Sequence, residues 1–337
     1  MAELPVQQHF FVLIKDKLPP SLSLVDEVAD LLKISTDSAY RRIRGEKELS
    51  FNEIEKLCTH FHCPIDALFN QKVTDQVSFR YNSLNSATFN FQDYLKSVCA
   101  SMRSIVVNPE REMIYAAKDI PIFYHFLNDE VGAFKSFVWQ KTLIGFPEFE
   151  NKKFLLSDTP DALLRLGKQS LHDYINIPGA ELWNVECFHS LFRQIEFYCE
   201  AGLFEKPSEA LLIVEKTGEL ISHLHLQAAL GKKFLPGDEP PMESNYKMYA
   251  NEVYLSDNTV LGIMGDRKIA FLTHCALNFL ATENEKFCNT TQEWFQNLIK
   301  KSSLISSVGE KDRNRFFSQV GAKYEALKEN VKHLLRK

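Results

Sequence analysis

The sequence predicts a mainly α-helical protein with a small five-helix domain at its N-terminus, a larger helical region, and a small antiparallel β meander near its C-terminus. Three observations lead to this prediction. Apolar residues recur at helical spacing through most of the chain. Residues that can cap helices stand directly before several of these stretches. Short β-prone runs separated by turn residues gather after residue 250.

The composition is that of a globular protein with an ample core. The chain has 337 residues, which favours two or three domains, and 45% of them are hydrophobic. The net charge is -5, so the whole molecule is not a polycation. No apolar run is long enough to span a membrane, and the first residues lack the basic-then-apolar pattern expected of a signal peptide. Seven scattered cysteines without a CxxC pair favour reduced thiols and a cytoplasmic location.

The first two predicted helices lie within residues 6–32. We expect the first over residues 6–18, because Pro19 and Pro20 cannot continue it. Ser23 is a good N-cap for the second, since its hydroxyl can accept a hydrogen bond from a free amide of the first turn. Four residues at helical spacing form the apolar stripe of this second helix, namely Leu24, Val28, Leu31 and Leu32.

A third short helix is expected between Ser35, its N-cap, and Gly45, where the left-handed conformation favours glycine. Ala39 and Ile43 are four residues apart, so they share a face and can point inward. Three arginines lie largely off that face and are expected to point outward, namely Arg41, Arg42 and Arg44. A helix this short is marginal alone in water and needs its neighbours to hold it.

Two more helices complete the predicted N-terminal domain, residues 1–72. Ser50 and Glu53 form a capping box, in which hydroxyl and carboxylate each satisfy a backbone amide. The apolar face of this fourth helix is predicted to consist of Phe51, Ile54, Leu57 and Phe61. A last short helix is expected over residues 65–69, after Pro64.

This order of helices resembles the Cro/C1-type (lambda-repressor-like) helix-turn-helix family, and more narrowly its BetR-like members. The matching stretches are 24–32 as supporting helix, 34–35 as turn, 36–44 as recognition helix, the Gly45-Glu46-Lys47 exit, and 63–69. Two residues depart from the family pattern. Lys33 stands where the turn usually has glycine, and Ile43 lies one place closer to Gly45 than the usual core residue.

The resemblance implies binding of duplex DNA, with the recognition helix in the major groove. It places base contacts on the first two turns of that helix, at Thr36, Asp37, Ser38, Tyr40 and Arg41. Whether Arg41 or Arg42 reads a base stays open, because the rotation of the helix is not fixed by the sequence. Arg44 and Lys47 lie beyond these turns and suit phosphates, which position a protein without reading sequence.

The charge of residues 1–72 limits this reading. Nine basic residues stand against eleven acidic ones, so the positive charge is local to the third helix and its exit. We therefore expect modest non-specific affinity, a shallow salt dependence, and a homodimer on paired half-sites.

Residues 73–90 are polar and are expected to form a linker, with a short strand over 77–81. A helical domain is predicted over residues 91–235. Its helices are expected over 91–105, from Asn108 toward Asp119, and over 161–174, 181–201 and 208–230. Six aromatic residues crowd one stretch and could line a ligand pocket, although a core is favoured: Phe123, Tyr124, Phe126, Phe134, Phe137 and Trp139.

Residues 242–337 are predicted to form a small α+β segment after a Pro- and Gly-rich stretch at 236–241. Strands are expected over 251–255, 260–264 and 268–273, followed by a helix capped near Asn289 or Thr290. The last stretch, 300–337, is helical and basic. It could touch the DNA backbone, but a solvated outer face is the favoured reading.

No catalytic motif is present: the chain lacks a P-loop, G-x-S-x-G, H-E-x-x-H and a dinucleotide fingerprint. Cys58 and His62 have the spacing of two zinc ligands on a helix, but a small core cysteine and a helix-end histidine are favoured. We therefore expect no enzyme, no metal and no cofactor.

The resulting hypothesis is a bacterial, cytoplasmic, DNA-binding transcriptional regulator. Its C-terminal region would dimerise the chain and sense a small molecule or a protein. The alternative is a protein-binding adaptor that docks a partner on its helical array and carries a helix-turn-helix domain that no longer reads DNA.

Overall fold

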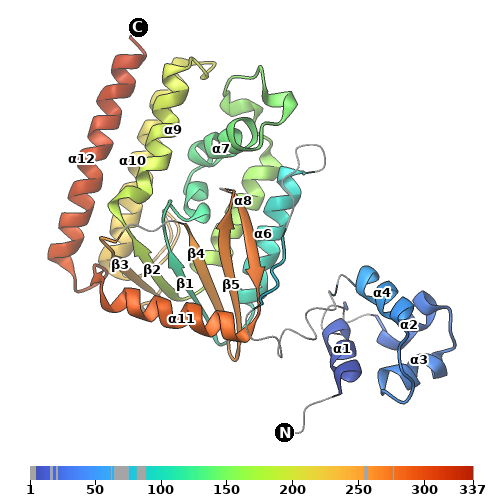
Figure 1. Ribbon diagram of the computed structural model, residues 1–337. Helices are drawn as coiled ribbons and strands as arrows, with labels where there is room; N and C mark the ends of the chain where they lie inside the picture. The colour runs from blue at the N-terminus through green and yellow to red at the C-terminus, as the bar shows by residue number, and fades with distance from the viewer. Residues whose placement is uncertain are drawn as a thin grey trace. The chain divides into compact units, whose positions relative to one another are not determined.

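The computed structural model describes residues 5–15, 18–19, 22–61, 63, 76–81, 89–253, 257–275 and 277–336. The chain divides into two compact parts, 1–78 and 79–337, which we call the N-terminal and C-terminal units. Figure 1 shows a small set of helices in the first and a sheet flanked by helices in the second. None of the helices among the described residues is long and apolar enough to cross a membrane.

The described helices of the N-terminal unit follow the predicted order. They are α1 (Val6–Lys15), α2 (Leu24–Leu32), α3 (Thr36–Ile43) and α4 (Phe51–His60). Ser23 caps α2, and Ser50 with Glu53 forms the predicted capping box on α4. The predicted fifth helix at 65–69 lies outside the described residues, as do residues 16 and 17 after α1.

A small apolar core holds these four helices together. Its fully or nearly buried members come from all four of them: Phe10, Phe11, Ile14, Val28, Ala29, Ala39 and Leu57. The prediction that Phe51 belongs to this core is wrong, because Phe51 is 85% exposed at the first position of α4. Helix geometry explains the difference, since Phe51 and Leu57 are six residues apart and therefore point about 120° away from each other around the helix.

The C-terminal unit contains a seven-stranded sheet with the order β6-β5-β4-β1-β2-β3-β7. Its strands are β1 (Arg111–Ala116), β2 (Gly179–Trp183), β3 (Tyr246–Ala250), β4 (Thr259–Met264), β5 (Arg267–His274), β6 (Asn278–Thr282) and β7 (Ser303–Leu304). The pairs β1–β2 and β2–β3 are parallel, and all other neighbours are antiparallel. The predicted small meander is therefore only one side of a larger mixed sheet.

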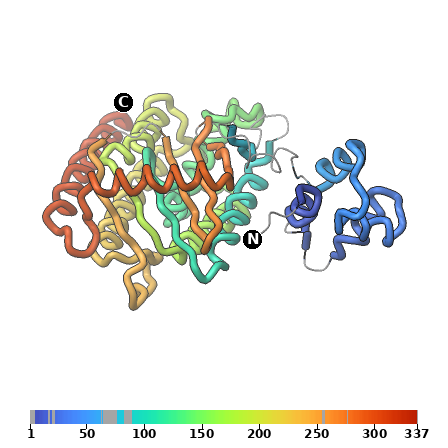
Figure 2. The backbone as a smooth tube through the Cα atoms, turned by 60° about the horizontal axis from the view of Figure 1, so that its bottom comes forward, coloured from blue at the N-terminus to red at the C-terminus, as the bar shows by residue number. Residues whose placement is uncertain are grey.

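Helices cover both faces of this sheet. The helices are α6 (Phe91–Val106), α7 (Asp129–Val138), α8 (Asp161–Ile175), α9 (His189–Glu200), α10 (Pro207–Leu230), α11 (Glu285–Lys300) and α12 (Glu310–Leu334). One face packs on α11 through Ile114, Leu261 and Phe295, and Figure 2 shows α11, in orange, crossing the strands. The other helices cover the opposite face, where α9, α10 and α12 pack side by side (Figure 1).

Two central strands were not predicted as strands. The sequence predicts a helix from Asn108 toward Asp119 and another over 181–201, but the structure has β1 and β2 at the start of these stretches. Both faces of these strands are covered, so both are buried almost without alternation. A strand buried on both faces lacks the period-two pattern that identifies a half-exposed strand.

The close pairing of β1 and β2 depends on a glycine. Gly179 opens β2 opposite Met113, and a Cβ atom at Gly179 would lie 1.8 Å from the carbonyl oxygen of Met113. No side chain fits at that distance. Strands from both sides of residues 236–241 share this sheet, so the predicted pieces 91–235 and 242–337 form one unit rather than two.

A buried carboxylate lies on β2, in the middle of the sheet. Glu181 is 2% exposed. The hydroxyls of Tyr124 (2.9 Å) and Tyr174 donate to its Oε1, and Trp183 Nε1 (2.7 Å) and the Tyr246 hydroxyl (2.8 Å) donate to its Oε2. Four donors thus satisfy a charge that would otherwise strongly oppose burial. Burial and the Glu181 charge together raise the pKa of all three tyrosines.

Several other predicted elements agree with the structure. The predicted helices 91–105, 161–174 and 208–230 correspond to α6, α8 and α10. The six aromatic residues between positions 123 and 139 are all buried. The cap of α11 is Asn284, which accepts from the amide of Phe287 at 2.9 Å, so the predicted cap at Asn289 or Thr290 is wrong by about one and a half turns.

Candidate nucleic-acid interface

The predicted recognition helix is α3, and its start and end are formed by local sequence signals. The Ser35 hydroxyl accepts a hydrogen bond from the amide of Ser38 at 3.3 Å. Gly45 follows the last turn with a φ of +76°, a conformation that favours glycine. Ala39 is fully buried on the inner side, and Ile43 is partly buried beside it. The predicted inward face is therefore present.

Arg42 points inward, so the prediction that it points outward with Arg41 and Arg44 is wrong. Its side chain is 7% exposed, and its guanidinium forms an ion pair with Glu53 of α4 at 2.7 Å. It also donates to the carbonyl of Ser38 at 3.2 Å. Of the two arginines between which the sequence left the base-reading role open, only Arg41 has an exposed side chain.

The outward face of α3 carries the other predicted contacts. Because residues three and four apart share a helix face, five exposed residues form one continuous surface: Thr36, Asp37, Tyr40, Arg41 and Arg44. Ser38 is half-buried beside this surface, and Lys47 is exposed in the following loop. We call these five residues the reading face.

The two outward arginines of the reading face make only weak contacts within the described part of the protein. Arg41 and Arg44 lie 4.0 and 3.8 Å from the carboxylate of Glu46, with side chains 56% and 67% exposed. Ion pairs this exposed contribute little to stability, so a phosphate or base can replace them at small cost. The Arg44 guanidinium also lies 5.5 Å from the centre of the Tyr40 ring, which keeps both side chains on the same side.

Two glutamines of α1 fasten the end of α3, and sequence reasoning missed them. Gln7 Nε2 donates to the carbonyls of Arg42 and Lys47, both at 2.7 Å, and Gln7 Oε1 accepts from the amide of Leu49 at 3.1 Å. Gln8 donates to the carbonyl of Arg44 at 2.7 Å. The available signal was the Gln-Gln pair itself, which precedes the apolar residues of the first helix.

The turn between α2 and α3 has a strained residue. Lys33 adopts a left-handed conformation with a φ of 56° and a ψ of 50°, at the position where the family usually has glycine. Its amide bonds the carbonyl of Asp30, and the amide of Ile34 bonds that of Ala29 at 3.0 Å. The turn therefore has the left-handed geometry with which helices commonly end at glycine, but here the residue is Lys33.

Comparison with known proteins agrees with this geometry. Residues 21–91, about a fifth of the chain, match the family model of the BetR domain, a helix-turn-helix-type DNA-binding domain family. The N-terminal unit contains a BetR-like domain. The match spans α2, α3 and α4, which include the reading face and the buried Arg42–Glu53 pair. At family level, the BetR domain suggests the role of a DNA-binding regulator.

No curated protein and no solved structure matches the chain. The described residues contain no group of three or more histidine, cysteine, aspartate or glutamate side chains placed to hold a metal ion, and His62 lies outside these residues. In the basic C-terminal stretch, Arg313 is buried against the carbonyl of Ile305, and Lys323 pairs with Glu186. Both cations therefore have partners within the C-terminal unit.

Proposed function

We propose that this protein is a sequence-specific transcriptional regulator that inserts α3 of its BetR-like domain into the major groove of duplex DNA. The observation that carries this proposal is the reading face. Arg41, Tyr40 and Arg44 project outward from a helix that the buried Arg42–Glu53 pair and the α1 glutamines hold in place. A rigid helix with exposed polar side chains is the element that reads base edges in this groove.

Each side chain then has a distinct role in the proposed complex. Arg41 can donate two parallel hydrogen bonds to O6 and N7 of a guanine. Arg44 and Lys47, at and beyond the end of the helix, would bind phosphates and set the register. Asp37 can accept a hydrogen bond from a cytosine amine, and its position in the first turn is favoured by the helix dipole.

The charge balance of the N-terminal domain bears on assembly. With nine basic and eleven acidic residues in positions 1–72, one domain offers few phosphate contacts. A single copy would therefore bind weakly, and two copies on paired half-sites would bind cooperatively. We propose that the C-terminal unit supplies this dimerisation and a sensing function.

The test begins with selection of genomic fragments by the full-length protein, followed by gel shift on the enriched sequence at two salt concentrations. Arg41→Ala is expected to weaken binding to the selected site by about 5- to 150-fold, the loss of one bidentate base contact. Binding to unrelated DNA should change little. Lys47→Ala should weaken all sequences alike and reduce the salt slope by about 1 per protomer.

The matched control is Lys15→Ala. Lys15 is exposed at the last position of α1, about 12 Å along that helix from Gln7. It should leave both kinds of binding unchanged. If the parent enriches no sequence, or if Arg41→Ala binds the selected site as the parent does, the proposed reading role of α3 is wrong. The adaptor alternative predicts the first of these results.

A further inference from the structure

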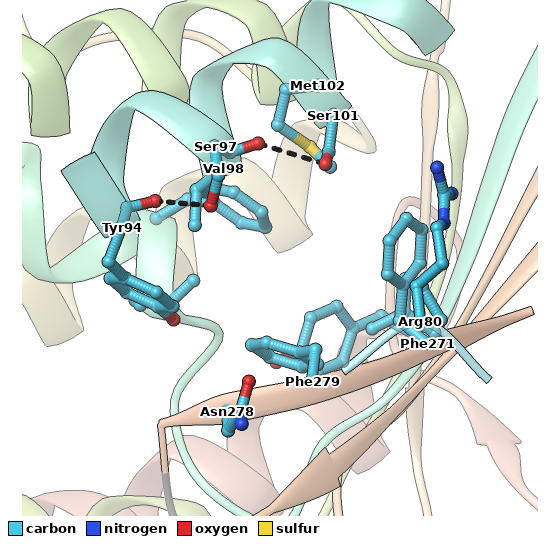
Figure 3. Close-up of a pocket in the computed structure, with 14 residues that line it drawn as sticks. Arg80, Tyr94, Ser97, Val98, Ser101, Met102, Phe271, Asn278 and Phe279 are labelled. Atoms are coloured by element: carbon cyan, nitrogen blue, oxygen red, sulfur yellow. Dashed lines mark hydrogen bonds between the residues drawn. The ribbon is translucent and has the colours of Figure 1, made fainter. Parts of the chain in front are cut away.

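The C-terminal unit contains an apolar cavity of about 260 Å³ between α6 and the strands β4 to β6. Figure 3 shows Val98 and Met102 of α6 on one side and Phe271 and Phe279 of the sheet on the other. Arg80 lies at one end, where it pairs with Glu283 at 3.4 Å. The cavity has the mostly apolar lining that is typical of small-molecule sites.

A second cavity, of about 160 Å³, adjoins the first. Four residues line both cavities, namely Tyr94, Tyr115, Ile122 and Phe279. The second cavity lies just beyond the carboxyl end of β1, where Asp119 is found, and Gln194 of α9 also lines it. The carboxyl ends of parallel strands are a usual place for ligands in α/β proteins.

The second cavity has a buried ammonium group. Lys135 is 4% exposed, and its Nζ donates to Gln194 Oε1 at 2.6 Å. Nζ also lies 5.2 Å from the centre of the Trp139 ring. Among the described residues Lys135 forms no ion pair, so a buried positive charge faces this cavity without a counter-ion in contact. Such charges are rare in cores unless they are paired.

A second buried polar atom lies in the same cavity wall. His125 is 4% exposed, and its Nδ1 has no hydrogen-bond partner in the part of the chain that the structure describes. Burial and the nearby Lys135 lower the pKa of His125 well below its usual range, so the ring is neutral at pH 7 and carries a single N–H, which donates from this position when it is on Nδ1. An unsatisfied buried group indicates a missing partner.

Asp119 does not act as the counter-ion of Lys135. It is half-buried, and its charge raises the pKa of Lys135, but burial lowers that pKa more, to about 8. The ammonium is therefore only partly compensated by the groups around it. Asp119 lies beyond ion-pair distance and makes no hydrogen bond to the Lys135 ammonium. An acceptor in direct contact with the ammonium would add such hydrogen bonds.

Another buried lysine shows what a purely structural arrangement looks like in this fold. Lys233 is 3% exposed, with a pKa that burial also lowers to about 8. Its Nζ donates to the carbonyl of Tyr174 at 3.2 Å and lies 4.3 Å from the centre of that ring. Lys233 lines neither cavity, whereas Lys135 lines one. The two buried lysines therefore differ in that a ligand can reach Lys135 from a cavity and cannot reach Lys233 from either one.

We propose that the two adjoining cavities bind a small organic acid, with its carboxylate at Lys135 and His125 and its apolar body against Val98, Met102 and Phe271. The carboxylate would accept hydrogen bonds from the Lys135 ammonium and from His125 Nδ1, in the tautomer that has the N–H on that atom. The site is inferred from the C-terminal unit alone. Its use as an effector site for DNA binding rests on the proposed function.

The test uses the full-length protein and three acids with apolar bodies, 3-phenylpropionate, 4-phenylbutyrate and octanoate, each beside its uncharged primary amide. Binding is measured by calorimetry and by the fluorescence of Trp139, which lines the smaller cavity. At least one acid is expected to bind about ten- to hundredfold more tightly than its amide, the usual contribution of hydrogen bonds to a charged group.

Two variants locate the site. Lys135→Met removes the charge and keeps an unbranched apolar side chain, so the preference for acid over amide should disappear. Lys233→Met is the matched control and should leave that preference unchanged. Ser101→Phe places a ring in the larger cavity, which Ser101 lines, and should abolish binding of both compounds while Lys135 stays in place. The parent's circular dichroism spectrum serves as the check on folding.

The outcomes separate the site from its role. If none of the three acids binds, if each binds no better than its amide, or if Lys233→Met loses the preference as Lys135→Met does, the proposed site is wrong. If an acid binds at Lys135 but gel shifts on the selected DNA do not change with the acid present, the site stands and its effector role is overturned. Failure to select any DNA concerns only the proposed function.

Discussion

Replacing Arg42 by methionine is expected to destabilise the N-terminal unit, although Arg42 belongs to α3, the helix that we propose reads DNA. The Arg42 guanidinium lies 2.7 Å from Glu53 Oε1, with the two side chains 7% and 20% exposed. Breaking a fully buried ion pair costs about 3–5 kcal/mol. Because Glu53 keeps some contact with water, we expect a loss of about 2–3 kcal/mol in the free energy of unfolding.

Hydrogen exchange followed by mass spectrometry measures this loss in the full-length protein. Peptides that cover α3 and α4 should exchange about 30- to 150-fold faster in Arg42→Met than in the parent, as the free-energy loss requires. Peptides from the C-terminal unit should not change and serve as an internal reference. Tryptophan fluorescence should also stay the same, because the chain's three tryptophans lie in the C-terminal unit.

Arg41→Met is the matched control, since the same substitution one position earlier falls on the exposed face of α3. It should leave exchange unchanged. If the two variants exchange equally fast, or if Arg42→Met exchanges like the parent, then the Arg42–Glu53 pair does not hold α3 against α4 and the argument fails.

The effect of Arg42→Met should also depend on pH. Burial raises the pKa of Glu53, but hydrogen bonds from the Ser50 amide and from Arg42 lower it more, so its net pKa lies below the usual value of 4.5. A carboxyl whose pKa is lower in the folded state stabilises that state above its unfolded pKa. This contribution is lost as the pH falls through the folded pKa. The difference in stability between parent and variant should therefore be full at neutral pH and shrink below about pH 4.

Three further predictions concern single sites. Lys33→Gly should slow exchange in α2 and α3 by a factor that corresponds to about 1 kcal/mol, because glycine relieves the left-handed strain; Lys33→Ala, which keeps a Cβ, should not. Glu181→Gln should lower the urea stability of the C-terminal unit by at least about 3 kcal/mol, because an amide accepts fewer of the four hydrogen bonds. Burial lowers the pKa of Lys135 from 10.5 to about 8, so Lys135 loses its proton at a lower pH in the folded state than in the unfolded state. The stability of the parent relative to Lys135→Met should therefore rise by about 1 kcal/mol between pH 7 and pH 9. Equal urea midpoints for Glu181→Gln and parent, or a pH-independent difference for Lys135→Met, would contradict the last two.

Signals confined to a few neighbouring residues allowed much of the BetR-like domain to be predicted. The caps at Ser23, Ser35 and Ser50 each involve an amide three residues away, so the pattern is complete within the sequence of one turn. The same holds for Gly45, whose role depends on its own backbone conformation. Local geometry of this kind can be read from spacing alone.

The sheet could not be predicted in the same way, because its contacts join distant residues. The strand β1 pairs with β4 about 150 residues later in the chain, through contacts such as Ile114 with Leu261. The carboxylate of Glu181 is satisfied by donors from positions as far apart as Tyr124 and Tyr246. In the sequence, Glu181 is simply a good helix former next to a helical stretch. Only the folded arrangement explains why a charged residue lies in the centre of a strand.

The orientation of Arg42 shows how a correct local prediction can hide a second role. Glu53 was assigned to the capping box of α4, and its Oε2 does accept from the Ser50 amide at 2.8 Å. Its other oxygen, Oε1, accepts from Arg42. The Glu53 carboxylate therefore caps α4 and also sets the rotation of α3 through Arg42. The spacing of Ser50 and Glu53 that identifies the capping box gives no sign of this second role. Since neighbouring residues on a helix differ by about 100° in direction, turning Arg42 inward turns Arg41 to the outside. The buried Arg42, which cannot reach DNA itself, thus positions Arg41, the side chain that we propose reads DNA.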